Sequence, residues 1–282
     1  MPEPATTATS EFSFSDGAFD QLAAIAHKRF GLSLPKSKKT LVYSRLSKRV
    51  RTLGLDSLDR YVYQLCDRIN PQEDTVLASL LTTNVTHFFR EAHHFQHLRD
   101  HCIPRLIEKA ANGERVRLWS AGCSSGQEAF CIGMLLIDAC PEIERYDIRV
   151  LGTDIDPKMV KTASSGMYPC ELVKTKKGFS VEPHFELDAR QQTYSASRKL
   201  RKIVSFAELN LIEPWPFSGT FDAIFCRNVA IYFDTQTQAE LWNRFAASLL
   251  QNGMLYLGHS ERLDDNALQK FRPVGVTTYE RL

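Results

Sequence analysis

The feature that most constrains the fold of this 282-residue chain is a change of pattern near Gly113. Beyond that point, short apolar stretches alternate with stretches of helical periodicity, which predicts a parallel sheet covered by helices. The expected strands are VRLWSAG, IRVLGTDI, FDAIFCRN and GMLYLG, with helices from about Gln127 to Cys140, from Pro157, and from about Thr235 to Leu250. The tail FRPVGVTTYERL is expected to join GMLYLG as a hairpin at the edge of the sheet.

The chain before Gly113 is helical in pattern. Apolar residues recur three and four positions apart between Ser15 and His101, which predicts a small helical domain. At roughly 150 residues per domain, the length agrees with two domains. We expect a flexible tail at 1–11, a helical domain at 12–90, a linker helix region at 91–113 and an α/β domain at 114–282. The alternation fails between about 170 and 206, where we expect an inserted small β-subdomain.

Composition and termini exclude several classes of protein. The net charge of +2 is too small to indicate a nucleic acid or membrane partner by itself. Seven cysteines without C-x-x-C spacing predict reduced, buried thiols. The start MPEPATTATSEFSF has neither the basic nor the apolar region of a signal peptide, and no apolar stretch approaches the ~18 residues of a spanning helix. We therefore expect a cytoplasmic protein that does not insert into membranes.

The most informative segment is LWSAGCSSGQEAF, in which a strand runs through a turn of small residues into a helix. Backbone at Gly122 and Gly126 can approach a ligand closely. The turn is not G-x-G-x-x-G and lacks the glycine that admits a pyrophosphate, so a nucleoside without phosphates fits better than a dinucleotide. Ser125 and Glu128 also stand in the register of a capping box, so capping and ligand contact remain equally open for Glu128.

Two carboxylates follow the next strand, IRVLGTDIDP. An acid at the end of the second strand can accept hydrogen bonds from a ribose diol, which makes Asp154 the candidate. Asp156 precedes Pro157, a favourable first helical residue, and is expected to be the N-cap. A glycine turn after one strand and an acid after the next together predict a nucleoside cofactor.

Several strings, in this order, resemble the chemotaxis receptor methyltransferases of the CheR family. They are TNVTHFFREAHHF, WSAGCSSGQE, LGTDID, LNL and FDAIFCRNVAIYFD, and the similarity extends over nearly the whole chain. The resemblance implies a class I Rossmann-like methyltransferase domain, preceded by an all-helical domain and carrying a small β-subdomain. It further implies an enzyme that uses S-adenosylmethionine, releases S-adenosylhomocysteine and esterifies glutamate side chains on the cytoplasmic domain of chemoreceptors, in the cytoplasm.

Site residues are carried over by motif. The resemblance implies cofactor contacts at Asn84, Thr86, Arg90, Glu128, Asp154, Asn210, Leu211, Asn228 and Val229. The family commonly has a Glu-Glu-Pro run after the glycine turn, whereas this chain has Gln127, Glu128 and Ala129. Receptor-tethered relatives carry a glycine-containing loop that grips a receptor's C-terminal pentapeptide, whereas Glu186 to Phe206 contains no glycine. We therefore predict docking without that peptide, and expect a monomer.

The acceptor decides what catalysis must supply. A glutamate with a pKa near ~4.3 is already ionised at neutral pH and requires no general base. Arg90 and Tyr232 are the candidates for orienting its carboxylate, although for Tyr232 a half-buried core position is equally open. Substrate docking is expected at the acid-free basic segment Gln21 to Leu55, where four cations share one side of a helix: Lys38, Arg45, Lys48 and Arg49. An electropositive helix would attract glutamate-rich receptor segments.

The sequence also admits three alternatives. A nucleic acid methyltransferase would suit a basic patch, but the chain has RNVAIY where amino-methylating DNA enzymes have an N-P-P-Y type tetrad. An inactive cofactor-binding adaptor would have lost residues near the methyl group, yet Arg90, Asn228 and Tyr232 are present. His93, His97 and His101 stand at helical spacing, but H-E-x-x-H is absent, and we expect packing rather than a metal site.

Overall fold

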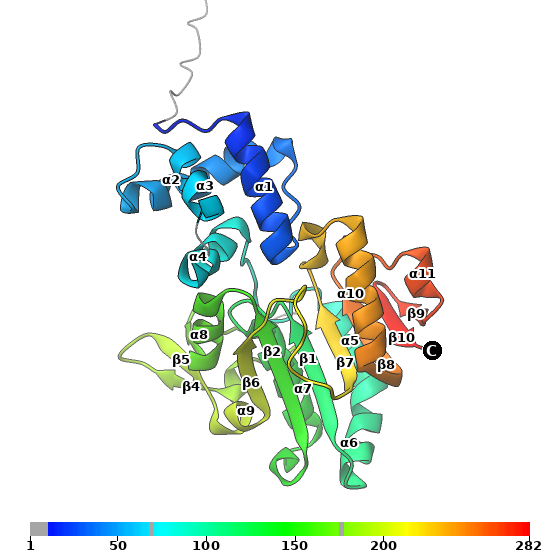
Figure 1. Ribbon diagram of the computed structural model, residues 1–282. Coiled ribbons are helices and arrows are strands. Elements are labelled where there is room, and N and C mark those ends of the chain that lie inside the picture. Colours follow the sequence, from blue (N-terminus) through cyan, green and yellow to red (C-terminus); the bar gives the residue numbers. More distant parts are fainter. Residues whose placement is uncertain (1–10, 68–69, 175–177) are drawn as a thin grey trace, which may run out of the picture. The chain divides into compact units, whose positions relative to one another are not determined.

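The chain divides into two compact units, Met1–Thr82 and Thr83–Leu282. The computed structural model describes residues 11–67, 70–174 and 178–282 (Figure 1). Residues 1–10 of the predicted tail lie outside the described residues. No described helix has the length and apolar character needed to cross a bilayer.

The first unit is helical. Its helices are α1 (Asp16–Phe30), η1 (Lys36–Lys38), α2 (Lys39–Thr52), α3 (Leu58–Asp67) and α4 (Pro71–Leu81). Local signals explain their ends: the Ser15 hydroxyl accepts from the Ala18 amide at the start of α1, and Gly31 ends that helix at φ 72°. Asn70 caps α4 ahead of Pro71. The apolar faces of α1 to α4 are buried against one another around Leu22, Leu46 and Tyr61.

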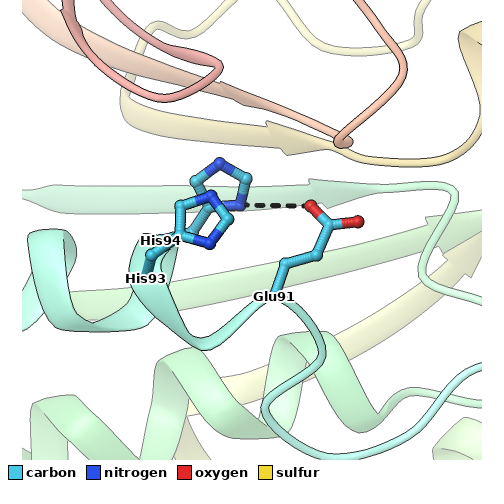
Figure 2. A group of neighbouring side chains, drawn as sticks. All are labelled: Glu91, His93 and His94. Atoms are coloured by element: carbon cyan, nitrogen blue, oxygen red, sulfur yellow. Dashed lines mark ion pairs between the residues drawn. The ribbon is translucent and has the colours of Figure 1, made fainter.

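The boundary between the units lies before the segment 83–90, not after it as predicted. The reason is that Phe88 and Phe89 belong to the core of the second unit, where Phe88 packs edge-on against Phe185 and Phe89 stacks on Phe179. Glu91 then adopts a left-handed conformation, φ 55°, and projects beside His93 and His94 (Figure 2). The predicted linker helix region contains α5 (Ala92–His97), a π-helical turn (Leu98–Cys102) and α6 (Ile103–Ala111).

A seven-stranded sheet forms the centre of the second unit, in the order β6-β2-β1-β7-β8-β10-β9. Its strands are β1 (Val116–Ala121), β2 (Ile148–Asp154), β6 (Val204–Glu208), β7 (Phe221–Cys226), β8 (Leu249–Leu257), β9 (Phe271–Gly275) and β10 (Thr278–Arg281). The first five pair in parallel, and β10 runs antiparallel to both β8 and β9. The predicted sheet and its closing hairpin are therefore confirmed.

Helices cover both faces of this sheet (Figure 1). They are α7 (Gln127–Ala139), η3 (Ile143–Arg145), α8 (Pro157–Ser165), α9 (Arg198–Ile203), η5 (Ala230–Tyr232), α10 (Thr235–Ser248) and α11 (Asp265–Leu268). Leu118 of β1 faces the core that α6 and α7 share, whereas the next residue, Trp119, meets Phe245 of α10. Because successive strand residues point to opposite faces, α10 lies on the other side of the sheet from α7.

The inserted β-subdomain exists, but it lies earlier than predicted. Its sheet, in the order β3-β5-β4, contains β3 (Met167–Pro169), β4 (Phe185–Asp188) and β5 (Thr193–Ala196), with η4 (Glu182–His184) before β4. The last part of the predicted range belongs to the main fold, because α9 packs on α7 and β6 pairs with β2. A short basic helix followed by a short strand gives no strong periodicity, so the sequence did not separate these elements from the insertion.

Candidate functional site

The carboxyl ends of β1 and β2 form the centre of the candidate site. In open α/β sheets, ligands bind outside the carboxyl ends of the strands where strand order reverses. Here the order reverses at β1, between β2 and β7. The amides of Gly122 and Cys123 both donate to the Thr153 carbonyl at 2.8 Å. The turn after β1 is thereby fixed to the end of β2.

Both glycines of this turn are required by its geometry. Gly122 has φ 81°, and a Cβ there would overlap the side chain of Val229. Gly126 has φ 96°, and a Cβ there would lie 2.7 Å from Cβ of Ala163. Only glycine adopts these conformations without strain and leaves the space free. Val229, one of the expected cofactor residues, therefore lies against the turn.

Of the two alternatives left open for Glu128, the capping box is not formed. Gly126 occupies the N-cap position of α7, and no side chain caps that helix. Because the left-handed glycine separates Ser125 from the helix, the Ser125 hydroxyl bonds instead to Oε1 of Gln127 at 2.8 Å. Glu128 accepts from the Ser120 hydroxyl at 2.6 Å. Glu128 thus faces the end of β1, which leaves the ligand-contact reading open for it.

Asp154 ends β2 and is buried. Its Oδ2 accepts from the Ser124 amide at 2.7 Å, and its Oδ1 accepts from the Asp156 amide at 2.9 Å. Burial raises the pKa of Asp154, although the two backbone hydrogen bonds act in the opposite direction. Each carboxylate oxygen keeps a further lone pair, so Asp154 can still accept both hydroxyl groups of a ribose.

Asp156 is the N-cap of α8, as predicted, and accepts from the Lys158 amide at 2.9 Å. The same carboxylate accepts from Nδ2 of Asn84 at 3.0 Å. The carbonyl of Asn84 in turn accepts from the Ser124 hydroxyl at 3.1 Å. Asn84, expected from the resemblance to contact the cofactor, is therefore tied to the turn beside Asp154.

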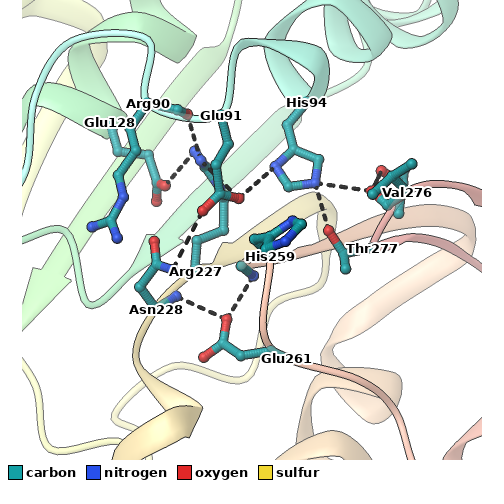
Figure 3. Close-up of polar contacts among 12 residues, drawn as sticks. Arg90, Glu91, His94, Glu128, Arg227, Asn228, His259, Glu261, Val276 and Thr277 are labelled. Carbon is teal, nitrogen blue, oxygen red and sulfur yellow. Dashed lines mark hydrogen bonds and ion pairs between the residues drawn. The ribbon is translucent and has the colours of Figure 1, made fainter.

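Arg227 lies at the end of β7 and joins several elements (Figure 3). Its side chain is only 2% exposed, with Nη1 3.0 Å from Oε2 of Glu128 and Nη2 3.3 Å from Oε2 of Glu91. Nη2 also donates to the carbonyl of Arg90. Burial raises the pKa of Glu128, and the guanidinium opposes that shift. Neither Arg227 nor Glu91 was selected from the sequence, although both lie in strings that carry the resemblance.

Glu261 organises the loop after β7, and sequence reasoning missed it. Its Oε1 accepts from the amides of Val229 at 2.9 Å and Ile231 at 3.3 Å. Its Oε2 accepts from the amides of Asn228 at 2.8 Å and Gly258 at 2.5 Å. Burial raises the pKa of Glu261, opposed by these four hydrogen bonds. No spacing rule links Glu261 to a loop thirty residues earlier, so only the structure reveals the contact.

The remaining predicted residues surround the same edge. Arg90 donates from Nη1 to the Val85 carbonyl at 2.9 Å, and Figure 3 shows its guanidinium pointing away from that of Arg227. The Tyr232 hydroxyl lies 3.5 Å from the carbonyl of Thr83, and its side chain is partly exposed. Thr86 is half-buried in the same segment. The structure thus places Arg90 and Tyr232 next to one loop, 83–90.

Asn210 and Leu211 follow the end of β6. The Leu209 amide donates to the Asp154 carbonyl at 3.0 Å, so this loop continues from the strand beside Asp154. The Asn210 side chain bonds to Glu213 at 3.1 Å, and the Leu211 carbonyl accepts from Nη1 of Arg244 at 2.5 Å. The two residues therefore lie at the carboxyl edge of the sheet with the other candidates.

No cysteine of the described chain offers an activated nucleophile at this edge. Cys226 and Cys123 are buried, and burial raises the pKa of both thiols well above the usual range. The expectation of free thiols is confirmed for all seven cysteines, but the expected burial is not general: Cys66 is exposed, and Cys140 and Cys170 are half-buried.

The basic segment of the first unit is more neutral than its sequence suggested. Acids from other parts of that unit pair with its cations: Asp74 with Arg29, Glu73 with Arg49, Glu11 with Arg51, Asp16 with Lys39 and Asp20 with Lys36. The composition of the segment could not reveal this compensation, because all five acids lie outside it.

Two of the predicted docking cations, Arg45 and Arg49, contact other residues of the first unit. Arg45 donates from Nη1 to the Leu81 carbonyl at 2.7 Å and the Thr82 carbonyl at 3.1 Å, at the end of α4. Arg49 pairs with Glu73, which also accepts from the Tyr61 hydroxyl at 2.6 Å. Lys48 is exposed and Lys38 is half-buried.

Comparison with known families agrees with this geometry. The model described as the CheR methyltransferase all-alpha domain matches residues 17–82, and the model described as its SAM binding domain matches residues 84–280. The chain belongs to the CheR family. The two matches meet where the structure divides the chain.

Curated CheR relatives match over most of their length. The chemotaxis protein methyltransferases of Salmonella typhimurium and Escherichia coli are each 36% identical over 275 residues, which cover 96% of this chain and 92% and 93% of theirs. The probable chemotaxis protein methyltransferase of Rhizobium etli is 43% identical over 255 residues, covering 88% of this chain and 94% of its own.

Membership of the CheR family confirms the predicted fold class, cofactor and enzyme class. The second unit is an S-adenosylmethionine-binding methyltransferase domain, and the chain is a methyltransferase of chemotaxis. Asp154, with two lone pairs beside a glycine turn, fits the ribose of this cofactor. Neither a nucleic acid methyltransferase nor an inactive adaptor is favoured by any of these matches.

Proposed function

We propose that this CheR enzyme esterifies glutamate side chains on the cytoplasmic domain of a chemoreceptor, with Arg90 and Tyr232 orienting the incoming carboxylate. The observation that carries the proposal is the meeting of the glycine turn, Asp154 and the loop after β7 at one edge of the sheet. Asp154 holds the ribose of S-adenosylmethionine. Asn84, Thr86, Arg90, Glu128, Asn210, Leu211, Asn228 and Val229 complete the cofactor site.

The reaction requires positioning rather than proton transfer. When bound, the cofactor supplies a methyl group on a sulfonium centre. The acceptor glutamate is ionised at neutral pH, with a reference pKa near ~4.3, so one of its oxygens can attack directly. Holding two reactants in line is worth about 7 to 11 kcal/mol in favourable cases. Arg90 bonds to the carbonyl of Val85 and Tyr232 to that of Thr83, both in the segment 83–90. Together they would hold a carboxylate by charge and by a hydroxyl donor.

Receptor docking uses the first unit. Lys48 is the foremost docking residue, since it is exposed on α2, and Lys38, Arg45 and Arg49 lie on the same helical side. The enzyme acts as a monomer and does not need a receptor's C-terminal pentapeptide. The absence of glycine from Glu186 to Phe206 supports that independence. Calorimetric binding of a tail pentapeptide at micromolar concentration would contradict it.

One assay tests the main proposal. The purified chain is incubated with methyl-labelled S-adenosylmethionine and a receptor cytoplasmic fragment, and the labelled fragment is then exposed to base. A methyl ester of glutamate releases its label in base, whereas N-methyl groups do not. The matched control is a fragment whose methylation-region glutamates are replaced by alanine, which should remain unlabelled. Base-stable label, or equal labelling of the control, would refute glutamate esterification.

A further inference from the structure

His94 presents a buried lone pair to its neighbours. The ring is fully buried, and its Nε2 lies 3.1 Å from the Val276 carbonyl and 2.9 Å from the Thr277 hydroxyl oxygen. A carbonyl oxygen can only accept a hydrogen bond, so Nε2 carries the ring proton. Nδ1 of the neutral ring is therefore an acceptor.

This acceptor faces a second acceptor. Nδ1 of His94 lies 3.6 Å from Oε2 of Glu91 (Figure 2), and within the described part of the chain both atoms are buried without a hydrogen-bond partner. Two buried acceptors that face each other without a donor are unfavourable. A cation or a hydrogen-bond donor bound between them would satisfy both.

The third nearby group is His93, which is exposed and whose ring centroid lies 4.0 Å from that of His94. Ligand atoms of Glu91, His93 and His94 all lie within 4.8 Å of one another. Two imidazoles and a carboxylate form a donor set common in zinc sites that keep one open position. Ligands at about 2.0–2.1 Å from a tetrahedral ion are roughly 3.4 Å apart, close to the separation between His94 and Glu91.

We propose that Glu91, His93 and His94 bind one divalent transition-metal ion of the zinc class beside the methyl-transfer site. The Val276 carbonyl accepts from Nε2 and thereby orients the His94 ring, as a carbonyl does for many metal-bound histidines. His97 and His101, which the sequence grouped with His93, take no part. Their rings lie together, with centroids 4.9 Å apart, along the π-helical turn.

Arg227 should lower the affinity of this site for a metal ion. Its Nη2 lies 3.3 Å from the same oxygen of Glu91, so the bound ion and the guanidinium share one carboxylate. Like charges at this range oppose each other, and the affinity should be lower than that of a closed structural zinc site. The ion would also weaken the pairing of Glu91 with Arg227.

The test uses the metal-stripped full-length chain with Co²⁺ alone as a spectroscopic probe and Zn²⁺ as competitor. The expected result is saturable binding of one Co²⁺, with visible absorption bands that Zn²⁺ removes. His93→Ala should weaken binding at least tenfold. Because His93 is exposed, the variant should keep its fold, which circular dichroism checks. The matched control is His101→Ala, also an exposed histidine, which should bind Co²⁺ unchanged.

A second variant identifies the ligand directly. His93→Cys should keep Co²⁺ binding and add a thiolate-to-cobalt charge-transfer band in the near ultraviolet. The proposal is overturned if Co²⁺ does not bind saturably, if His93→Ala binds as well as the parent, if His101→Ala alone loses binding, or if His93→Cys lacks the new band.

Discussion

Nη1 of Arg227 lies 3.0 Å from Oε2 of Glu128, joining the end of β7 to the first turn of α7 across the candidate cofactor site. The Arg227 side chain is buried and also neutralises Glu91. A buried ion pair of this kind contributes little net stability, but removing one partner is costly because it leaves an unpaired charge. Arg227 therefore holds two carboxylates in place at the edge of the site.

Arg227→Met should destabilise the protein by about 3 to 5 kcal/mol, because Glu91 and Glu128 lose their shared cation. Urea denaturation measures the change. The matched control is Arg145→Met, which removes an exposed partner of Glu142 and should change the free energy of unfolding by less than about 1 kcal/mol. Similar losses in the two variants would mean that burial gives Arg227 no special role.

Glu261→Gln should loosen the loop Asn228–Ile231. An amide has one acceptor oxygen, so its NH₂ group would face two of the four backbone N–H donors that Glu261 now satisfies. We expect a loss of about 1.5 to 3 kcal/mol in stability, the usual worth of hydrogen bonds to a charged group. Binding of S-adenosylhomocysteine should weaken as well. Asp265→Asn, an exposed carboxylate nearby, serves as control, and an equal effect there would contradict the expectation.

Asp154 should make cofactor affinity depend on pH. Because burial raises its pKa, the carboxyl takes up a proton at a higher pH than an ordinary aspartate. Protonation removes acceptor capacity for the ribose, so affinity for S-adenosylhomocysteine should fall as pH is lowered through this raised pKa. Calorimetry across a pH series measures the slope. Asp154→Asn should bind S-adenosylhomocysteine more weakly at neutral pH, and its affinity should not change with pH over this range. If affinity falls with pH equally in both proteins, a group other than Asp154 titrates.

Tyr232→Phe tests the proposed orienting hydroxyl. We expect kcat to fall by tenfold or more, since removing one hydrogen bond that acts in the transition state costs at least about 1.4 kcal/mol. The dissociation constant for S-adenosylhomocysteine should stay the same, because no cofactor contact is assigned to this hydroxyl. Unchanged turnover would show that the hydroxyl does not orient the substrate and that Tyr232 is a half-buried packing residue.

The two kinds of cation on α2 should behave differently. Lys48→Glu should raise KM for a receptor fragment at low salt and leave stability unchanged, because Lys48 is exposed. Arg49→Gln should instead lower stability by about 1 to 2 kcal/mol through loss of its bonds to Glu73. KM at two salt concentrations and urea denaturation separate these effects. A Lys48→Glu enzyme with normal KM would leave α2 without a docking role.

The Arg49 effect should also depend on pH. Burial acts to raise the pKa of Glu73, but hydrogen bonds from Arg49 and Tyr61 outweigh it and lower the pKa below the ordinary value of 4.5. Stability from this contact is therefore present above the unfolded-state pKa and is lost as pH falls through the lower folded-state value. The difference between parent and Arg49→Gln should shrink over that acidic range.

Local patterns accounted for much of the fold and part of the site. The strand ends, the glycine turn, Asp154 and the cap at Asp156 follow from short-range spacing, and the structure has them where the sequence placed them. The boundary of the insertion was missed, because β6 is recognisable only by its pairing with β2.

Long-range pairing was the part that sequence reasoning could not supply. Glu128 satisfied a capping pattern, yet its partner is Arg227, which comes from another strand. Arg49 lay in an acid-free segment, yet its partner Glu73 comes from α4. Hydrophobic periodicity predicts which face of a helix or strand is buried. It does not predict which charged side chain of a distant segment pairs with a residue on that helix or strand.

The dependence of the Asn228–Ile231 loop on Glu261 has a consequence for how the enzyme becomes active during synthesis. The last string that carries the family resemblance, FDAIFCRNVAIYFD, ends at Asp234, so the ribosome completes all of these strings before it adds Glu261. A chain that ends just before that residue would carry all of these strings and still lack the carboxylate that accepts from the Asn228, Val229 and Ile231 amides. A frameshift allele that ends between residues 235 and 260 loses this carboxylate together with β9 and β10, so it should be inactive although its strings are complete.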